Sequence, residues 1–466
     1  MSLAVVFMYL EGFFLLYFVM LYSGYLMLNV LSIYAVWQYM QSHSINSMPQ
    51  LYSGLEPPIS LLAPAYNEEA SIVDSVNALL QLNYPEFEII IINDGSKDET
   101  LARLKDAFDL VEFPEAYRRR IDTKEVKKLY VSRTHTNLRV LDKENGGKAD
   151  SLNAGINVSR FPLFCAVDAD SVLQRNSLEK IVQPFMDDPT TIAAGGTVRI
   201  VNGCTIERGF LVKAALPRSF LARIQVTEYL RAFLFGRLGW SPLNALLIIS
   251  GAFGLFHKET VVSVGGYLTD TIGEDMELIV RLHKVMRKQK RKYKITFVPD
   301  PICWTEAPED LATLRNQRIR WQRGLSESLI NNIDLLFARN SGFVGWLAMP
   351  YMLFFEWAGP FIELTGFIMV TVGFMSGYLS WEVSSVFFMV AIAFGMLLSS
   401  VAILLEEMSF KIYPSFGYVF VLLFMALVEN IGYRQLNSYW RIVAMYQWIR
   451  GKKATWGEMK RGGMGV

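Results

Sequence analysis

The chain has 466 residues, of which 52% are hydrophobic and only 19% are charged. Soluble domains carry about 25% charged residues, so this composition argues against an entirely soluble protein. Forty-five basic and 44 acidic residues give a formal net charge of +1, which does not support binding to nucleic acid through overall electrostatic attraction. Three widely separated cysteines form no disulfide framework and fit a reduced, cytosol-facing domain, and four histidines without metal-ligand spacing do not support a zinc site.

Residues 1–45 are predicted to form a membrane segment. Residues 3 to 40 are almost wholly apolar, with Glu11 as the only acidic residue, and the first Lys or Arg of the chain is Lys97. A secretory signal peptide has a basic start and a short apolar region, and this segment has neither. The run is too long for one straight span and too short for two spans with a turn, because one span needs about 20 residues. We therefore expect a single long or tilted helix.

Residues 55–335 have an ordinary soluble composition and are predicted to alternate between strand and helix. Apolar runs at residues 59–63, 87–92 and 162–167 predict buried strands, and the periodicity of residues 69–82 predicts a helix. Continuous apolar runs are typical of a mostly parallel sheet that helices cover on both faces. The expected fold class is therefore a Rossmann-like α/β domain inserted between membrane helices.

Polar residues follow each predicted strand, where sheets of this kind bind their ligands. They are Tyr66 and Glu68 after the first strand, Asp94 after the second, and Asp168 and Asp170 after the third. Each group alone fits an ordinary turn, since Asn, Asp and Gly favour turns. Three such groups at strand ends favour a binding site.

The chemistry of these residues suits a metal ion and a phosphate. Asp168 and Asp170 can hold Mg²⁺ or Mn²⁺ through hard carboxylate oxygens, and with no basic neighbour in the sequence their mutual repulsion calls for a cation. Gly146-Gly147-Lys148 precedes a predicted helix, where backbone amides and a lysine can meet a phosphate. This segment is not a P-loop, because Asp142 and Ala149 stand where that motif requires glycine and Ser or Thr.

Two further motifs lie on predicted helices. Asp275 falls in the first turn of a helix that follows Gly273, where an acidic residue is either a favourable partner of the helix dipole or a general base. Gln317, Arg320 and Trp321 share one helical face. An amide, a guanidinium and an indole suit a diphosphate and a stacked sugar ring better than a core, although a solvated basic face is the alternative.

A second apolar block covers residues 342–433 and is predicted to contain interface and transmembrane helices with two to four spans. Breaks divide it into pieces near residues 343–358, 360–380, 383–404 and 415–433. Residues 434–466 form a basic, aromatic tail, which the positive-inside rule places in the cytosol. With the α/β domain also facing the cytosol, the segments after residue 342 are expected to cross an even number of times, which places the N-terminus outside.

The order of these motifs resembles the membrane-embedded, processive family 2 glycosyltransferases, such as cellulose, hyaluronan and poly-N-acetylglucosamine synthases. The matching pieces run from Pro64 through Trp321, and the flanking membrane segments match as well. Two positions depart from the pattern: Ser250-Gly-Ala-Phe-Gly254 lacks a cysteine that several members carry, and Gly273 stands where cellulose synthases usually have Thr.

This resemblance implies a GT-A fold and an inverting transfer from a UDP-sugar to a β-linked polysaccharide that is passed across the membrane. It also implies a role for each site residue. Tyr66 and Glu68 would line the nucleoside pocket, Asp94 would bind uracil, Lys148 would approach the diphosphate, Asp168 and Asp170 would hold the divalent cation, Asp275 would be the base, and Gln317, Arg320 and Trp321 would close over the diphosphate and acceptor sugar.

The expected partners are the UDP-sugar donor, a growing polysaccharide or lipid acceptor, and membrane lipids, with no nucleic acid. The expected location is the plasma (inner) membrane, with several spans and a cytosolic catalytic domain. One alternative is transfer of a single sugar to a lipid, because ceramide glucosyltransferases resemble the same motif set. The other is a non-enzymatic scaffold, which the complete set of acidic residues argues against. The sequence identifies neither the sugar and linkage nor any accessory export protein.

Overall fold

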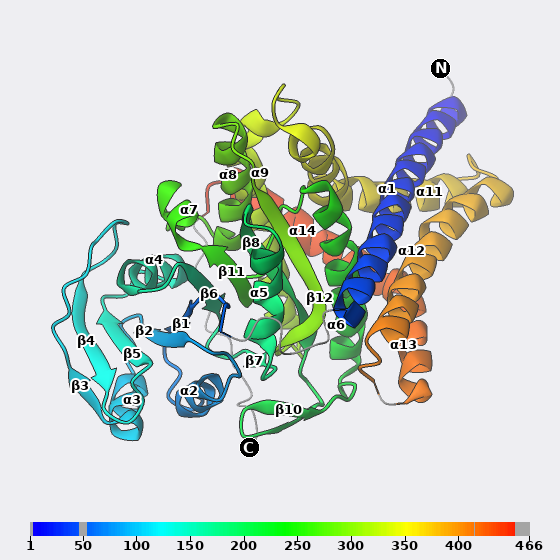
Figure 1. Cartoon of the computed structure of the whole chain (residues 1–466). Coiled ribbons are helices and arrows are strands. Elements are labelled where there is room, and N and C mark those ends of the chain that lie inside the picture. Colours follow the sequence, from blue (N-terminus) through cyan, green and yellow to red (C-terminus); the bar gives the residue numbers. More distant parts are fainter. Residues whose placement is uncertain (1–2, 46–53, 414, 453–466) are drawn as a thin grey trace.

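The computed structural model describes residues 3–45, 54–413 and 415–452. Residues 453–466 of the tail predicted to be basic and aromatic therefore lie outside the described residues. Figure 1 shows an α/β domain on one side and a group of long helices on the other.

A ten-stranded sheet forms the centre of the α/β domain, in the order β3-β4-β5-β2-β1-β6-β11-β8-β12-β7. The pairings give seven strands one direction and leave β4, β7 and β11 antiparallel to them. This arrangement confirms the predicted fold class. The strands are β1 (Ile59–Ala65), β2 (Phe87–Asn93), β3 (Leu110–Glu112), β4 (Val126–Ser132), β5 (Leu138–Lys143), β6 (Leu163–Val167), β7 (Val172–Leu173), β8 (Thr191–Ile200), β11 (Phe253–His257) and β12 (Lys294–Thr305), while β9 (Thr205–Glu207) and β10 (Phe210–Lys213) pair in a separate hairpin.

Helices cover both faces of this sheet, which explains the continuous apolar strands. In β2, residues 88–93 are all buried. The helices of the domain are α2 (Ile72–Leu80), α3 (Thr100–Phe108), α4 (Lys148–Val158), α5 (Ser177–Asp187), α6 (Phe220–Leu230), α7 (Lys258–Ser263), α8 (Glu274–Lys288) and α9 (Leu311–Asn331). Between α6 and β11 lie the short helices η1 (Arg231–Phe235) and η2 (Leu238–Leu243).

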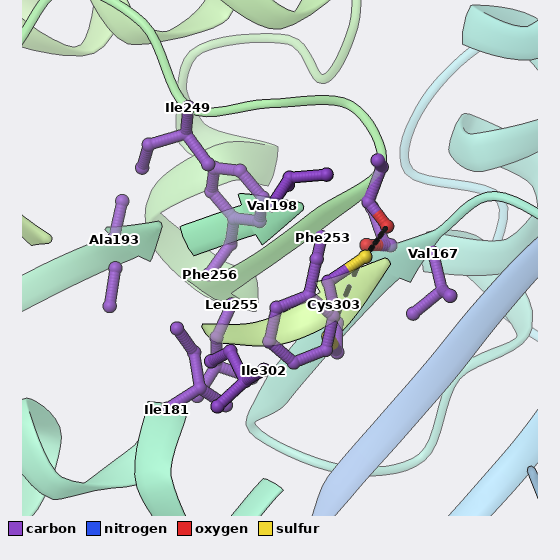
Figure 2. Packing of buried hydrophobic residues seen from close by; sticks show 14 of the residues in the cluster. Val167, Ile181, Ala193, Val198, Ile249, Phe253, Leu255, Phe256, Ile302 and Cys303 are labelled. Atoms are coloured by element: carbon purple, nitrogen blue, oxygen red, sulfur yellow. Dashed lines mark hydrogen bonds between the residues drawn. The ribbon is translucent and has the colours of Figure 1, made fainter. Parts of the chain in front are cut away.

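The core beneath the strand ends is packed from small and large residues in alternation. Figure 2 shows Phe253 and Ile302 packed around β8 and β11, with Cys303 among them. A side chain at Gly196 of β8 would lie 2.7 Å from Ile302, so β8 needs a glycine there. Burial raises the pKa of the Cys303 thiol, which suits a structural residue. This core keeps the ends of β6 and β12 at fixed positions.

Within the described residues, three helices have the length and composition of membrane spans, at residues 5–41, 381–409 and 416–449. A pair at residues 344–357 and 359–375, bent by 43°, is a fourth candidate. The first belongs to α1 (Leu3–Ile45), a single helix. The remaining elements are η3 (Ile333–Leu335), η4 (Val344–Ala348), α10 (Met349–Tyr351), η5 (Met352–Trp357), α11 (Gly359–Met375), α12 (Trp381–Ser409), α13 (Phe416–Val428), η6 (Glu429–Tyr433) and α14 (Arg434–Ile449).

Ring contacts define the directions of these helices. Phe18 of α1 lies 5.4 Å from Phe387, and Tyr22 lies 5.2 Å from Phe394 one turn or more farther along each helix, so α1 and α12 run in the same direction. Phe7 stacks on Tyr378, just beyond the end of α11, so α11 runs in the opposite direction. The apolar face shared by these three helices forms a separate hydrophobic cluster.

The last membrane segment is not straight. Ile431 and Gly432 have non-helical backbone angles, with φ of +86° at Gly432. After this kink, α14 packs against α9 of the α/β domain and against α11. The chain therefore returns to the domain that carries the predicted site.

Candidate active site

One cavity of about 1390 Å³ contains the whole predicted site. All ten candidate residues line it, although they come from positions 66 to 321 of the sequence. The carboxyl ends of β1, β2 and β6 bring the residues of the three strand ends together, because these strands are parallel neighbours.

Asp94 holds the glycine loop that leads into α4. Its carboxylate accepts hydrogen bonds from the Gly146 and Gly147 amides at 2.9 and 2.8 Å, and from Lys143 Nζ at 2.7 Å. Lys143 is fully buried and also pairs with Asp150 at 2.6 Å. This network fixes the backbone just before Lys148. The predicted contact between Asp94 and uracil would add to bonds that both carboxylate oxygens already make.

Lys148 reaches from the start of α4 to the end of β6. Its Nζ forms an ion pair with Asp168 and donates to the Gly251 carbonyl at 3.1 Å. Although burial opposes it, the Asp168 carboxylate raises the pKa of Lys148, so the side chain is cationic. The sequence offered no cation next to Asp168, and the fold supplies one from 20 residues away.

The two predicted metal ligands fit a divalent cation that is shared with a substrate. Asp168 and Asp170 both line the cavity, and the side chain of Asp168 is 32% exposed. Within the described residues, no group of three His, Cys, Asp or Glu side chains could hold a metal ion alone. Two carboxylates facing an open cavity leave positions for phosphate oxygens and water, as Mg²⁺ and Mn²⁺ require.

Asp275 lies at the start of α8, beside the loop before β11. Its Oδ2 accepts from the Gly251 amide at 3.2 Å, and its Oδ1 accepts from the Met276 amide at 2.8 Å. The adjacent Glu274 is buried. Burial raises the pKa of Glu274 to about 7, with Lys148 lowering it and Asp275 raising it further. Two carboxylates thus face one cavity in different environments.

A close helix crossing places Asp275 against the helix that carries the Gln-Arg-Trp motif. A side chain added at Gly273 would lie 2.7 Å from the Gly324 backbone, and one at Gly324 would lie 2.8 Å from Gly273. Both positions therefore need glycine. This contact explains why Gly273 stands before the acidic pair, and the sequence alone showed no link between these glycines.

On α9, Gln317 is buried, Arg320 is partly buried and Trp321 is 44% exposed. Burial lowers the pKa of Arg320, with nearby carboxylates opposing that shift. The Arg318 guanidinium lies 4.6 Å from the Trp321 ring centre. The ring centre of Tyr229, which belongs to α6, lies 6.4 Å from that of Trp321. The indole thus contacts both side chains and lines the cavity.

Sequence reasoning missed Arg237, which lines the cavity between η1 and η2. Its guanidinium lies 3.7 Å from the Phe233 ring centre, and its buried Nη1 has no hydrogen-bond partner among the described residues. Burial lowers its pKa to about 10, opposed by the Asp275 carboxylate. Arg237 and Asp275 thus line the same cavity.

The cavity continues between the long helices. Its lining there includes Tyr22 of α1, Glu363 of α11, Gly395 of α12 and Arg434 of α14. Arg434 pairs with Glu363 at 3.0 Å. Arg231 pairs with Glu429, which also accepts from Ser399 at 2.9 Å. Two members of the apolar cluster shared by α1, α11 and α12, Tyr22 and Leu398, also line the cavity.

Comparison with known proteins identifies the family. The family model for glycosyl transferase family group 2 matches residues 163–428, and that for glycosyl transferase family 2 matches residues 60–210. The chain belongs to glycosyl transferase family group 2. This membership confirms the resemblance predicted from the motifs.

Its curated relatives include the poly-β-1,6-N-acetyl-D-glucosamine synthases of Staphylococcus aureus (strain COL), 31% identical over 322 residues, and of Staphylococcus epidermidis, 28% identical over 332 residues. The first match covers 68% of this chain and 66% of the relative, and the second covers 71% and 70%. The chain thus spans about two thirds of the length of these glycosyltransferase relatives.

The fold is similar to that of the mannosyltransferase PcManGT from Pyrobaculum calidifontis, solved in complex with GDP-Man and Mn²⁺. The TM-score is 0.51 with 18% sequence identity, covering 88% of this chain and 99% of the other. This likeness supports the GT-A-type fold of the α/β domain.

Proposed function

We propose that this protein is an inverting glycosyltransferase that adds sugars from a UDP-sugar to a β-linked polysaccharide and passes the product across the membrane. The observation that carries the proposal is one cavity, in which the candidate donor site, Asp275 and Trp321 are continuous with polar residues of α1, α11, η6 and α14. A site for one sugar does not need such an extension.

At the donor end, Tyr66 and Glu68 would flank the nucleoside, and Asp94 would hold the adjacent loop and meet the base. Lys148 and Arg320 would bind the diphosphate, on which negative charge grows as the sugar leaves. Asp168 and Asp170 would hold Mg²⁺ or Mn²⁺, which neutralises part of that charge when bound. Loss of turnover in excess chelator would support this role, and full turnover would contradict it.

The transfer step needs a base, because a sugar hydroxyl is a poor nucleophile. Asp275 would take the hydroxyl proton as the acceptor oxygen bonds to the anomeric carbon. The bond from that carbon to the diphosphate breaks, and the nucleoside diphosphate leaves with the electron pair. One displacement from an α-linked donor gives a β-linked product. Asp275 is favoured over Glu274, since two backbone amides orient it whereas Glu274 is buried beside Lys148.

Trp321 would stack on the acceptor sugar, with Gln317 beside it. A polymer leaving this platform would meet the polar lining between the helices. The relatives are named as synthases of poly-β-1,6-N-acetyl-D-glucosamine, so UDP-N-acetylglucosamine is the first donor to test. Trp321→Ala should shorten the polymer while donor binding changes less. An exposed tryptophan at the start of α12, Trp381, provides the control Trp381→Ala.

The helix directions are compatible with a cytosolic catalytic domain in the plasma membrane. If α1, α11 and α12 span the membrane, the α/β domain lies on the same side as the C-terminal ends of α1 and α12. The N-terminus of the chain then lies on the other side. Two crossings after residue 342 satisfy the even number expected, with α13 and α14 returning to the domain. A reporter at residue 466 that is found outside would contradict this topology.

A second candidate, transfer of one sugar to a lipid, is favoured by one observation. The apolar cluster of α1, α11 and α12 adjoins the cavity, because Tyr22 and Leu398 belong to both, so an acceptor linked to a lipid would also fit there.

Product mass separates the two candidates. Purified protein is incubated with a panel of UDP-sugars, and nucleotide release and product size are measured. A ladder of products differing by one sugar supports polymerisation, whereas a single glycolipid supports the second candidate. No nucleotide release with any donor would contradict both.

A further inference from the structure

A basic patch lies at the end of α8 and in the loop that follows it. Lys288, Lys290, Arg291 and Lys292 are all exposed, and none has an ion pair among the described residues. The two flanking lysines do have acidic partners: Lys284 pairs with Asp334 at 2.8 Å and Lys294 with Asp188 at 3.5 Å. Four like charges without counterions mark a surface that suits an anionic partner.

Aromatic side chains adjoin this basic patch. Phe337, Phe343 and Trp346 are 47%, 54% and 56% exposed. Phe337 and Trp346 contact each other with ring centres 5.4 Å apart. Arg287, next to Lys288, lies against Gly342, where an added side chain would be 2.9 Å from Arg287 Nη1. The basic patch and the three aromatic residues together form what we term the basic–aromatic surface.

The position of this surface relates it to the membrane. Its aromatic part leads directly into the bent helix pair at residues 344–375, one of the candidate spans. Figure 1 shows the segment after α9 (yellow) at the top of the α/β domain, between α9 and the group of long helices. Aromatic rings favour the level of the lipid headgroups, and basic side chains beside them attract anionic lipids.

We infer that the basic–aromatic surface binds the headgroups of anionic phospholipids in the leaflet that faces the α/β domain. The three rings would enter the interface, and the four cations would pair with lipid phosphates. This contact would also brace α8, which carries Asp275 at its other end. The effect on catalysis rests on the proposed function, but the binding of lipid does not.

The test uses the full chain reconstituted in nanodiscs that contain equal amounts of phosphatidylcholine and phosphatidylglycerol. After gentle extraction, native mass spectrometry counts the lipids of each class that stay bound. Wild-type protein should retain phosphatidylglycerol in preference. In a variant with Lys288, Lys290, Arg291 and Lys292 replaced by Gln, the ratio of bound phosphatidylglycerol to phosphatidylcholine should fall at least about fivefold. One basic residue near an anionic surface already contributes about that factor.

A matched control replaces four exposed basic residues on the α3–β4 side of the domain, namely Arg103, Arg118, Arg119 and Lys127, by Gln. The control should keep the wild-type preference. An equal loss in the control, an unchanged preference in the first variant, or no preference in the wild type would overturn the inference. Full displacement of the lipid by millimolar glycerol 3-phosphate would also overturn it and indicate a site for a soluble anion. Because no sugar is present, these outcomes are independent of transferase activity.

Discussion

The two ends of the cavity use charge in different ways. At the proposed donor end, Asp168, Asp170 and Lys148 come from strand and helix ends and face an open cavity. At the membrane end, Glu363 with Arg434 and Glu429 with Arg231 pair across helices that are far apart in the sequence.

This difference distinguishes charges that are available to bind a substrate from ion pairs that hold together the helices lining the cavity. A donor-end cation can exchange its carboxylate partner for a phosphate, because the cavity beside it has room. A membrane-end pair in an apolar setting loses much more if it is broken, since an unpaired charge there is poorly solvated. We expect donor-end changes to affect chemistry and membrane-end changes to affect product length or folding.

The largest effect is expected where the donor site meets the acceptor. Asp275→Asn keeps the size of the side chain but removes the proton acceptor, and a positioned base typically contributes ~10² to 10⁴ in rate. We expect the variant to fold and bind the nucleotide sugar with similar affinity, yet turn over at least about a hundredfold more slowly. Calorimetry and nucleotide release measure the two parts.

Glu274→Gln is the matched control for that change. Near-normal turnover in Asp275→Asn together with an inactive Glu274→Gln would assign the base to Glu274. The two glycines at the helix crossing, Gly273 and Gly324, are left unchanged so that geometry stays constant.

Arg237 should have the next largest effect, on acceptor use. Its unpaired Nη1 beside Asp275 suits a hydrogen bond to an acceptor oxygen, and hydrogen bonds of charged groups contribute about 1.5–3 kcal/mol. Arg237→Met should therefore lower kcat/KM for an added oligosaccharide acceptor by roughly 10- to 100-fold, with the KM for the donor little changed.

Arg287 offers a control for this substitution, because its guanidinium also lies over a ring, 5.5 Å from the Tyr293 centre, and does not line the cavity. Arg287→Met should leave the acceptor KM unchanged. A larger rise in donor KM than in acceptor KM for Arg237→Met would move this arginine to the diphosphate.

At the membrane end, Glu363→Gln should shorten the product while the initial rate of nucleotide release stays close to that of the wild type. The reason is that Arg434 then lacks its carboxylate partner, so the wall of the extension is altered while the residues around Asp275 are unchanged. Gel electrophoresis of the product measures its length. A large fall in rate with unchanged length would show that the two ends do not act separately.

The smallest effect concerns stability and pH. Because the pKa of Glu274 is raised to about 7 in the folded protein, the folded state binds its proton more tightly than the unfolded state. In the metal-free protein, protonated Glu274 therefore stabilises the folded state below about pH 5. This contribution to the free energy of unfolding, roughly 1–3 kcal/mol, is lost as the pH rises to 7. The melting temperature of Glu274→Gln, relative to that of the wild type, should therefore be higher at pH 8 than at pH 5.

A constant difference between the two proteins across this range would contradict the raised pKa. The comparison needs chelator in both samples, since a bound cation near Asp168 would itself change the charge around Glu274.

The residues at the strand ends could be predicted from the sequence. Tyr66, Asp94 and Asp168 each follow an apolar run, and parallel strands bring such ends to one edge whatever the rest of the chain does. The membrane segments were also visible, because apolar length is a local property of the chain.

Only the tertiary structure showed the contacts made between distant elements. Arg237 lies in an apolar stretch without a motif, yet the fold brings it beside Asp275. The kink at Ile431 and Gly432 turns α14 back onto α9, and Lys148 supplies the cation that Asp168 lacked in the sequence. Local patterns predict which side chains face a strand end or a bilayer, whereas partners from other elements depend on how those elements pack.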